Sequence, residues 1–170
     1  VSYKSKTKNL QTLFSSRNLQ QLIMVMGNQK SLDGIEKSEK LQILYLYYAR
    51  SLQDISALEK VKKTLKVLCL NHCPKIEDYS VLEKMENLQT LMIYGNHKIS
   101  DIQFISKIKS LKRFRFSVNI LDGDLSPCLK LEEATSMTNR KHYNLKDEEL
   151  PKNYDCPFGN EGIEEWMLYW

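Results

Sequence analysis

Cysteine and histidine lie closest together at Cys69, His72 and Cys73, and these residue types supply thiolate nucleophiles and zinc ligands in proteins. Cys69 and His72 can both lie on the outer surface of one strand segment, which would suit a thiolate and its base. However, no Asp or Asn is predictably placed behind His72, and no oxyanion donors can be identified. The other histidines, His97 and His142, are too far along the chain to complete a zinc site. We therefore predict no enzyme activity, no cofactor and no metal, with a Cys-dependent enzyme as the least favoured alternative, and reduced thiols in an intracellular protein.

A carboxylate also recurs at intervals of 23 or 24 residues, and each copy taken alone resembles a catalytic group. A catalytic carboxylate has no reason to repeat, whereas a carboxylate at a recurring turn can accept hydrogen bonds from backbone amides. We therefore predict a turn-capping role for Asp54, Asp78, Asp101 and Asp124.

These residues occupy fixed places in a repeat. Four regular copies begin at Leu41, Leu65, Leu88 and Leu111, and a less regular copy begins at Leu19. Places 1, 4 and 6 of the regular copies are Leu, Ile or Phe, so alternating side chains point to one side of a short strand. Apolar residues at places 12, 15, 18 and 21 follow a period near three, which favours a 3₁₀ or short helix.

One coil of this kind cannot bury its own apolar face, so neighbouring coils must stack. The sequence therefore predicts an α/β solenoid, a horseshoe with a parallel sheet on the concave face and short 3₁₀ or helical turns on the convex face. We expect residues 1–18 to form an N-terminal half-coil or cap, and residues 19–139 to form about five coils plus a terminal strand. Residues 140–170 are expected to form an acidic, Trp-containing C-terminal tail or cap.

The regular copies, and above all the segment NHKISDIQFISKIKSL, resemble bacterial leucine-rich-repeat proteins of the internalin-like type. Repeats of that type follow the pattern L-x-x-L-x-L-x-x-N-x-I-x-D-I. The resemblance covers about residues 10–139; it implies the leucine-rich-repeat horseshoe and is nearly silent about the partner. A small side chain at the ninth place leaves backbone groups of the turn to water or to neighbours. That place holds Asn96 and Asn119 in two copies, but Gly27, Ala49 and Cys73 in the others.

In such a solenoid, places 3, 5, 7 and often 8 point outward from the sheet, where a surface without a partner should be polar. Here these places carry aromatic and apolar residues together with two arginines. Tyr, Met and Arg are enriched in the cores of protein interfaces, because each gives a large contact area with a polar or adaptable end. We therefore predict that another protein binds the concave face through Ile43, Tyr45, Tyr47, Cys69, His72, Met92, Tyr94, Arg113 and Arg115.

Because charge is unevenly distributed along the chain, either an outside protein or the chain's own acidic tail could bind the concave face. The formal net charge is +4, with +9 on residues 1–131 and −5 on the remainder. The tail segment EGIEEWMLYW is both acidic and apolar, and a helix would place its apolar residues on one side. Its carboxylates, Glu161, Glu164 and Glu165, could then meet the two arginines. Binding of an outside protein is the favoured prediction, and coverage by the protein's own tail is its rival.

A sharper version of the binding hypothesis is a bacterial immunity protein or inhibitor that blocks a toxin or an enzyme. Small stand-alone repeat proteins similar to this one occur in that role, and a basic body could meet an acidic target. The alternative is a structural or targeting repeat domain of a larger cell-surface protein. Nucleic-acid binding is not expected, because Asn71, His72 and Glu133 interrupt any basic stripe on the concave face. No apolar run approaches the roughly 20 residues needed to span a membrane. We expect a cytoplasmic protein, or a secreted or surface protein if a signal before Val1 was removed.

Overall fold

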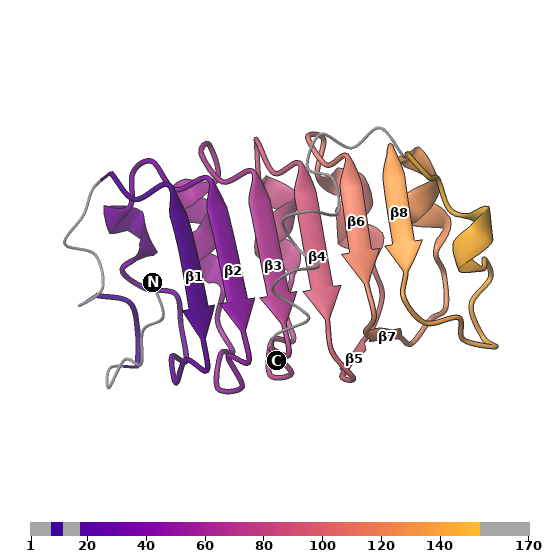
Figure 1. Ribbon diagram of the computed structural model, residues 1–170, viewed down its shortest axis with the longest axis horizontal. Helices are drawn as coiled ribbons and strands as arrows, with labels where there is room; N and C mark the ends of the chain where they lie inside the picture. Colours follow the sequence, from indigo (N-terminus) through magenta and orange to yellow (C-terminus); the bar gives the residue numbers. More distant parts are fainter. Residues whose placement is uncertain (1–7, 12–17, 154–170) are drawn as a thin grey trace.

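The computed structural model describes residues 8–11 and 18–153. Within them, six strands form one parallel sheet in the order β1-β2-β3-β4-β6-β8, so consecutive coils lie side by side (Figure 1). Each strand begins at the third place of its repeat, which confirms the predicted solenoid and its concave-face sheet. The strands are Gln21–Val25 (β1), Ile43–Tyr47 (β2), Val67–Asn71 (β3), Thr90–Tyr94 (β4), Arg113–Phe116 (β6) and Glu133–Ser136 (β8).

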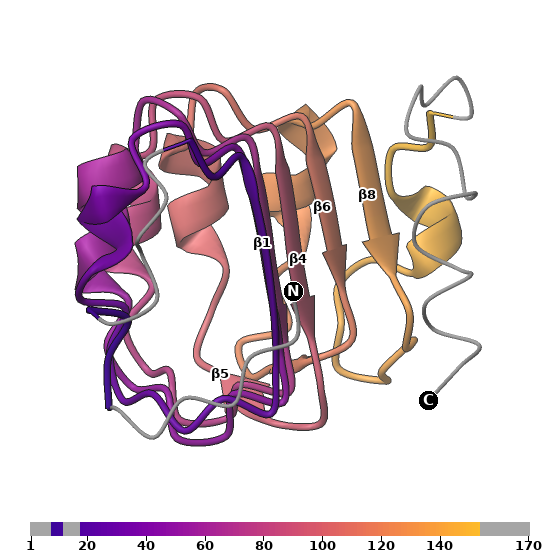
Figure 2. The ribbon, with the colours of Figure 1, turned by 60° about the vertical axis from the view of Figure 1, so that its left-hand side comes forward.

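Short 3₁₀ helices return the chain on the other side of the sheet, as the near-three period predicts (Figure 2). Apolar residues on these helices face the interior; Leu58 and Val61 of η2, for example, are both buried. The described residues contain no helix long and apolar enough to cross a membrane. The helices of the coils are Ile35–Lys37 (η1), Ser56–Val61 (η2), Ser80–Lys84 (η3), Gln103–Lys107 (η4) and Ser126–Lys130 (η5).

The interior is one continuous apolar cluster built from the same places of every coil. At place 4, Leu44, Leu68, Leu91 and Phe114 are fully buried, and their strands pair them directly across neighbouring coils. Burying a side chain of this size stabilises the fold by about 1.5–3 kcal/mol before chain entropy is subtracted. Because the contacts cross from coil to coil, each coil is stable only against its neighbours.

The recurring aspartates cap the turns that lead into the 3₁₀ helices. In each coil the Oδ1 atom accepts a hydrogen bond from the backbone N–H two residues further on. This confirms the capping role predicted from their repetition. The pairs are Asp54 with Ser56 (2.8 Å), Asp78 with Ser80 (2.8 Å), Asp101 with Gln103 (2.9 Å) and Asp124 with Ser126 (3.0 Å).

The turns between the strands and the 3₁₀ helices add one feature that the sequence pattern did not predict. Below β4 and β6, the strands β5 (Lys98–Ile99) and β7 (Asn119–Ile120) form a second, two-stranded parallel sheet. At the ninth place, Cys73 packs in the interior, and its Sγ lies 3.9 Å from the Leu46 carbonyl oxygen and 3.6 Å from that of Asn71. A thiol is a weak donor, so it replaces only part of what an asparagine would supply.

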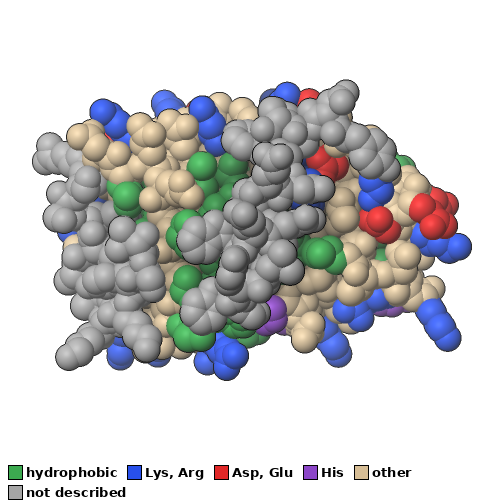
Figure 3. Space-filling view, in the orientation of Figure 1, with side chains coloured by type: hydrophobic (Ala, Val, Ile, Leu, Met, Phe, Trp, Pro, Cys, Tyr) green, Lys and Arg blue, Asp and Glu red, His purple; other side chains and the backbone are tan. Residues whose placement is uncertain are grey.

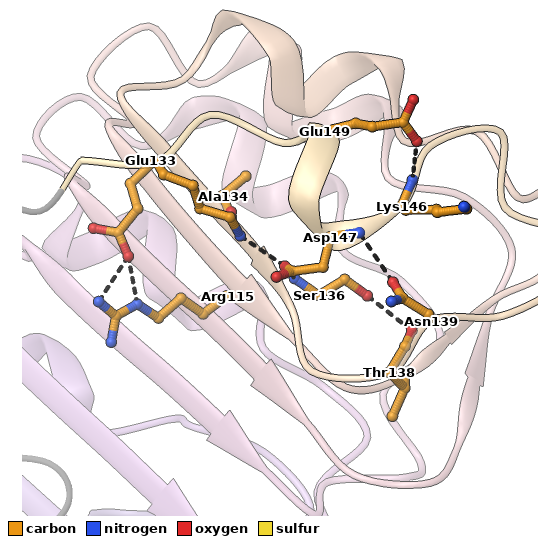
Figure 4. Close-up of polar contacts among 10 residues, drawn as sticks. Arg115, Glu133, Ala134, Ser136, Thr138, Asn139, Lys146, Asp147 and Glu149 are labelled. Atoms are coloured by element: carbon orange, nitrogen blue, oxygen red, sulfur yellow. Dashed lines mark hydrogen bonds and ion pairs between the residues drawn. The ribbon is translucent and has the colours of Figure 1, made fainter.

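The outer edge of β8 is closed by the chain that follows it (Figure 4). The Ser136 N–H donates to Asp147 Oδ1 (2.7 Å) at the start of η6 (Asp147–Glu149), and the Ala134 N–H donates to the Pro151 carbonyl oxygen (2.8 Å). Leu150 between them is buried. An edge strand with unpaired backbone groups is a site for aggregation, and these contacts remove it.

The other end of the solenoid is covered by residues next to the first coil. Leu10 is fully buried, and its N–H donates to the Asp33 carbonyl oxygen (2.7 Å). Most of the predicted N-terminal cap, and the last seventeen residues of the predicted tail, lie outside the described residues.

Truncation of a central interior side chain should weaken the whole solenoid. We expect Leu68→Ala to lower the free energy of unfolding by about 2–5 kcal/mol, because Leu68 is fully buried between two coils. The exposed neighbour Lys66 gives a matched control, and Lys66→Ala should stay within about 0.5 kcal/mol of wild type. Urea denaturation followed by circular dichroism measures both; equal stability of the two variants would contradict the assigned interior.

The capping aspartates should make stability depend on acid. The backbone amide of Ser80, which donates a hydrogen bond to Asp78, lowers the pKa of that carboxyl in the folded state. The ionised carboxylate therefore contributes fully to folding stability above the unfolded pKa of about 3.9. This contribution is lost as pH falls through the folded pKa. We expect Asp78→Ala to cost about 0.5–1.5 kcal/mol at pH 7. The difference from wild type should shrink below about pH 4. Asp78→Asn keeps an acceptor without the charge, so its stability relative to Asp78→Ala should not depend on pH. Urea titrations from pH 7 to pH 3 make the comparison.

Candidate functional site

The concave face, defined here as the side of the six-stranded sheet that points away from the 3₁₀ helices, carries the outward side chains in three rows. The rows follow from the strand register, because residues paired across parallel strands point to the same side. Every residue predicted for the site except His72 lies on one of them. The rows are Gln21, Ile43, Val67, Thr90, Arg113 and Glu133; then Ile23, Tyr45, Cys69, Met92, Arg115 and Thr135; then Val25, Tyr47, Asn71 and Tyr94.

The centre of this face is apolar and closely packed. Cys69 and Met92, which are paired between β3 and β4, are only 2% and 1% exposed. Tyr94 is buried beside them, and the half-buried Tyr45 and Val67 pack against the group. These five residues are called the central cluster below. It lies across the sheet from the interior and is separate from it.

On β2, Tyr47 lies next to Tyr45 of the central cluster and extends its aromatic surface. The rings of Tyr45 and Tyr47 lie 6.2 Å apart at an angle of 50°, and both are half-buried. Burial raises the pKa of Tyr47 to about 12 and also raises the pKa of Tyr45, with a smaller effect from Cys69. Both hydroxyls therefore remain protonated at neutral pH and can donate hydrogen bonds at the edge of an apolar surface.

A left-handed backbone turn ends three successive strands at the eighth place. Met26, Tyr48 and His72 have φ angles of 55°, 56° and 54°, and Gly95 takes the place in the next coil with φ of 137°. The turn lets each N–H reach the carbonyl of the following strand: Met26 to Tyr47, Tyr48 to Asn71 and His72 to Tyr94, at 2.7–2.8 Å. Bulky residues rarely adopt this conformation, and each residue held in it destabilises the fold by about 1 kcal/mol or more.

The left-handed turns bring the side chains of neighbouring coils together at the rim of the sheet. The rings of Tyr48 and His72 stack with centroids 4.7 Å apart and planes at 22°. The Arg50 guanidinium lies over the Tyr48 ring, 5.9 Å from its centroid. The rim therefore continues the aromatic surface of β2 and adds a cation to it.

A buried charge cluster occupies the β6–β8 end of the face. Glu133 Oε1 accepts from Arg115 Nε (2.8 Å) and lies 2.7 Å from a terminal nitrogen of the same guanidinium (Figure 4). Arg113 Nε lies 3.6 Å from Glu133 Oε2, too far for a hydrogen bond, and within the described part of the chain both atoms are buried without a hydrogen-bond partner. The tail carboxylates predicted to meet these arginines lie outside the described residues. Glu133, which the sequence analysis treated only as an interruption of a basic stripe, is the described carboxylate that pairs with Arg115.

The cysteines and histidines do not form the pair that their spacing suggests. Cys69 lies in the central cluster, whereas Cys73 belongs to the interior and His72 bonds through Nδ1 to Asn71 Oδ1. Burial raises the pKa of Cys69 well above its usual range and that of Cys73 to about 12, so both thiols are protonated at neutral pH. In the described part of the chain, no three His, Cys, Asp or Glu side chains lie close enough to hold a metal ion.

Comparison with protein families supports the repeat assignment. A family described as "Leucine Rich repeats (2 copies)" matches residues 63–107, which span β3, β4 and the helices η3 and η4. No curated protein matches the chain. The matched repeats and the six-stranded parallel sheet together make the fold a leucine-rich-repeat solenoid.

The chemical state of Cys69 gives a direct test of this surface. We expect iodoacetamide to leave Cys69 unmodified in the native protein at neutral pH, because the thiol is both buried and protonated. The same protein in urea should be alkylated at every cysteine. Peptide mapping by mass spectrometry distinguishes the sites; rapid native modification of Cys69 would contradict the geometry and return a thiolate mechanism to consideration.

Proposed function

We propose that this leucine-rich-repeat protein binds another protein through its concave face. Leucine-rich repeats generally mediate protein–protein contacts. The observation that carries the proposal is the half-buried aromatic surface formed by Tyr45, Tyr47 and Tyr48 of one coil, continued by His72 of the next. Such residues supply large contact areas with little loss of side-chain entropy, and they are enriched at binding hot spots.

The way the surface is held supports the same proposal. Tyr45 and Tyr47 stand on a central strand of a rigid sheet, and Tyr48 is fixed by a left-handed turn that bonds to the next coil. Strained turns of this kind persist where the surrounding structure holds them, and they gather at binding sites. A surface already held in its binding conformation loses less entropy when a partner docks.

Charge favours an acidic partner. All 25 Lys and Arg residues lie in residues 1–153, which carry a net charge of +8, and the rim places Arg50 beside the aromatic surface. An acidic protein would be drawn to such a body by long-range attraction. In this proposal the protein is an inhibitor or immunity protein that covers the surface of a toxin or enzyme, because a rigid binding face can block an enzyme without chemistry of its own.

Removal of the aromatic surface should abolish partner binding and leave the solenoid intact. We expect Tyr45→Ala/Tyr47→Ala to weaken capture of a partner by at least roughly tenfold, since both side chains lie at the centre of the proposed contact. The measurement is affinity capture from a lysate of the source organism, with candidate partners confirmed by titration. The exposed Lys60 of the convex side gives the control Lys60→Ala, which should capture as wild type does.

Thermal unfolding followed by circular dichroism checks that both variants fold. Undiminished capture by a folded Tyr45→Ala/Tyr47→Ala protein would place the binding site elsewhere. Equal loss in the Lys60→Ala control would show that the captured protein recognises the body of the molecule by charge alone.

A further inference from the structure

We propose that the rim of the sheet binds an acidic segment of the partner protein, with the carboxylates of that segment against a short basic and aromatic strip. The strip stands where β2, β3 and β4 end, outside the three rows of the concave face. The proposal rests on the proposed function, because the segment belongs to the protein that docks on that face. The side chains of this rim strip are Tyr48, Arg50, His72, Lys75, His97 and Lys98.

The aromatic side chains of the rim strip form one series of contacts across three coils. The Arg50 guanidinium lies over the Tyr48 ring, and that ring stacks on His72 of the next coil. His72 and His97 approach each other at Gly95. A Cβ atom placed there would stand 3.5 Å from the Cα atom of His72 and 3.0 Å from Nδ1 of His97. Glycine therefore leaves room for the His97 ring beside the stacked pair, in addition to adopting the left-handed turn.

Positive charge follows the same edge. Arg50 holds place 10 of its coil, Lys75 and Lys98 hold place 11 of the next two, and all three side chains are exposed. No acidic residue occurs at places 8 to 11 of any of the five copies. Lys and Arg side chains stand along the lower edge of the view in Figure 3, where β2 to β4 end. Since consecutive coils lie roughly 4.8 Å apart, the three cations form a short row of one sign.

The cations of this row have no acidic partner among the described residues. No ion pair in that part of the chain includes Arg50, Lys75 or Lys98. The capping aspartates that follow them are already bonded to backbone amides. Elsewhere on the coils, lysines pair with a glutamate of a neighbouring coil. These pairs are Lys62 with Glu86, Lys84 with Glu59, Lys107 with Glu83 and Lys112 with Glu132, each at 2.9 Å.

The residue types at the eighth place indicate a role for the side chains themselves. Gly95 shows that the left-handed turn needs only a backbone, yet Met26, Tyr48 and His72 adopt the same turn at φ angles of 54–56°. A glycine at any of these positions would remove the strain. The interior gains little from Met26, whose side chain is 55% exposed. Contact with a partner accounts for side chains that the turn does not require.

An acidic protein segment fits this edge better than a nucleic acid strand does. From Met26 to Lys98 the edge crosses three strand spacings, about 14 Å, which about four residues of extended chain cover. Arg and Lys bind carboxylates through charge-assisted hydrogen bonds, and Met26 offers an apolar contact at one end. Burial, and to a smaller degree His72, lowers the pKa of His97, so that ring is neutral at neutral pH. A strip this short with three fixed cations suits a run of Asp or Glu, whereas a nucleic acid strand needs a longer basic groove.

Nuclear magnetic resonance of the histidine rings tests the proposal on the full chain. Two of the three histidines lie in the rim strip, and the third, His142, bonds to the Ile120 carbonyl oxygen of β7 and serves as an internal control. The probe is a synthetic peptide of about six residues, one leucine followed by glutamates. We expect titration to shift the ring signals of His72 and His97 and to leave those of His142 in place. No shift, or equal shifts of all three rings, would overturn the proposal.

Two further probes identify what the rim strip recognises. The same peptide with glutamine in place of glutamate should leave the rings of His72 and His97 unshifted, since its side chains carry no charge. An oligothymidylate with as many negative charges should bind more weakly than the glutamate peptide. Equal or tighter binding of the oligothymidylate would assign the strip to nucleic acid and overturn an acidic protein segment as its ligand.

Charge-matched variants separate the rim strip from the net charge of the protein. Arg50→Gln/Lys75→Gln/Lys98→Gln should weaken binding of the glutamate peptide by at least roughly tenfold. The control Lys63→Gln/Lys66→Gln/Lys109→Gln removes equal charge from exposed residues near the amino ends of the strands and should bind as wild type does. An equal loss in both variants would show attraction by overall charge and would overturn a local site.

The variant Tyr48→Gly tests the strained turn. Glycine keeps the turn and removes the ring, so we expect a melting temperature at or above that of wild type and a severalfold loss of peptide affinity. Wild-type affinity in this variant would contradict the role assigned to the ring.

These measurements need no captured partner, so the rim strip and the proposed function fail separately. Peptide binding by a protein that captures no partner would overturn only the concave-face proposal. Capture that depends on Tyr45 and Tyr47, by a protein that does not bind the peptide, would overturn only the rim strip.

Discussion

The apolar side of one coil has nowhere to be buried except against the next coil, and this constraint sets the whole molecule. Leu44, Leu68, Leu91 and Phe114 lie in register across four strands because each fills the space beside the last. Once that interior register is fixed, the opposite side of every strand is fixed as well. The rows of the concave face therefore arise from the packing of the interior, and the side chains on them are free to vary.

The sequence correctly predicted to which side of the sheet each strand residue points, because successive side chains on a strand alternate between the two sides. It did not predict how far each side chain is exposed, since the burial of Cys69 and Met92 depends on packing against neighbours more than twenty residues away in the sequence. The Arg115–Glu133 pair was missed for the same reason, as it requires the register between two separate coils. The left-handed turns at Tyr48 and His72 were not predicted either. A glycine such as Gly95 indicates a left-handed turn in a sequence, because glycine adopts positive φ angles without strain. A tyrosine or histidine gives no such signal, since the coils on either side hold it in that conformation.

The buried charges show how the end of the solenoid differs from its middle. At the centre of the face the outward places hold Cys69 and Met92, which tolerate desolvation without partners. At β6 and β8 the outward places hold Arg113, Arg115 and Glu133, whose pairing among the described residues is incomplete. A buried ion pair adds little net stability over apolar residues of similar size, but it strongly disfavours any contact that leaves a charge unpaired. In the proposed complex, this end of the face would contribute selectivity and the tyrosines of β2 would contribute contact area.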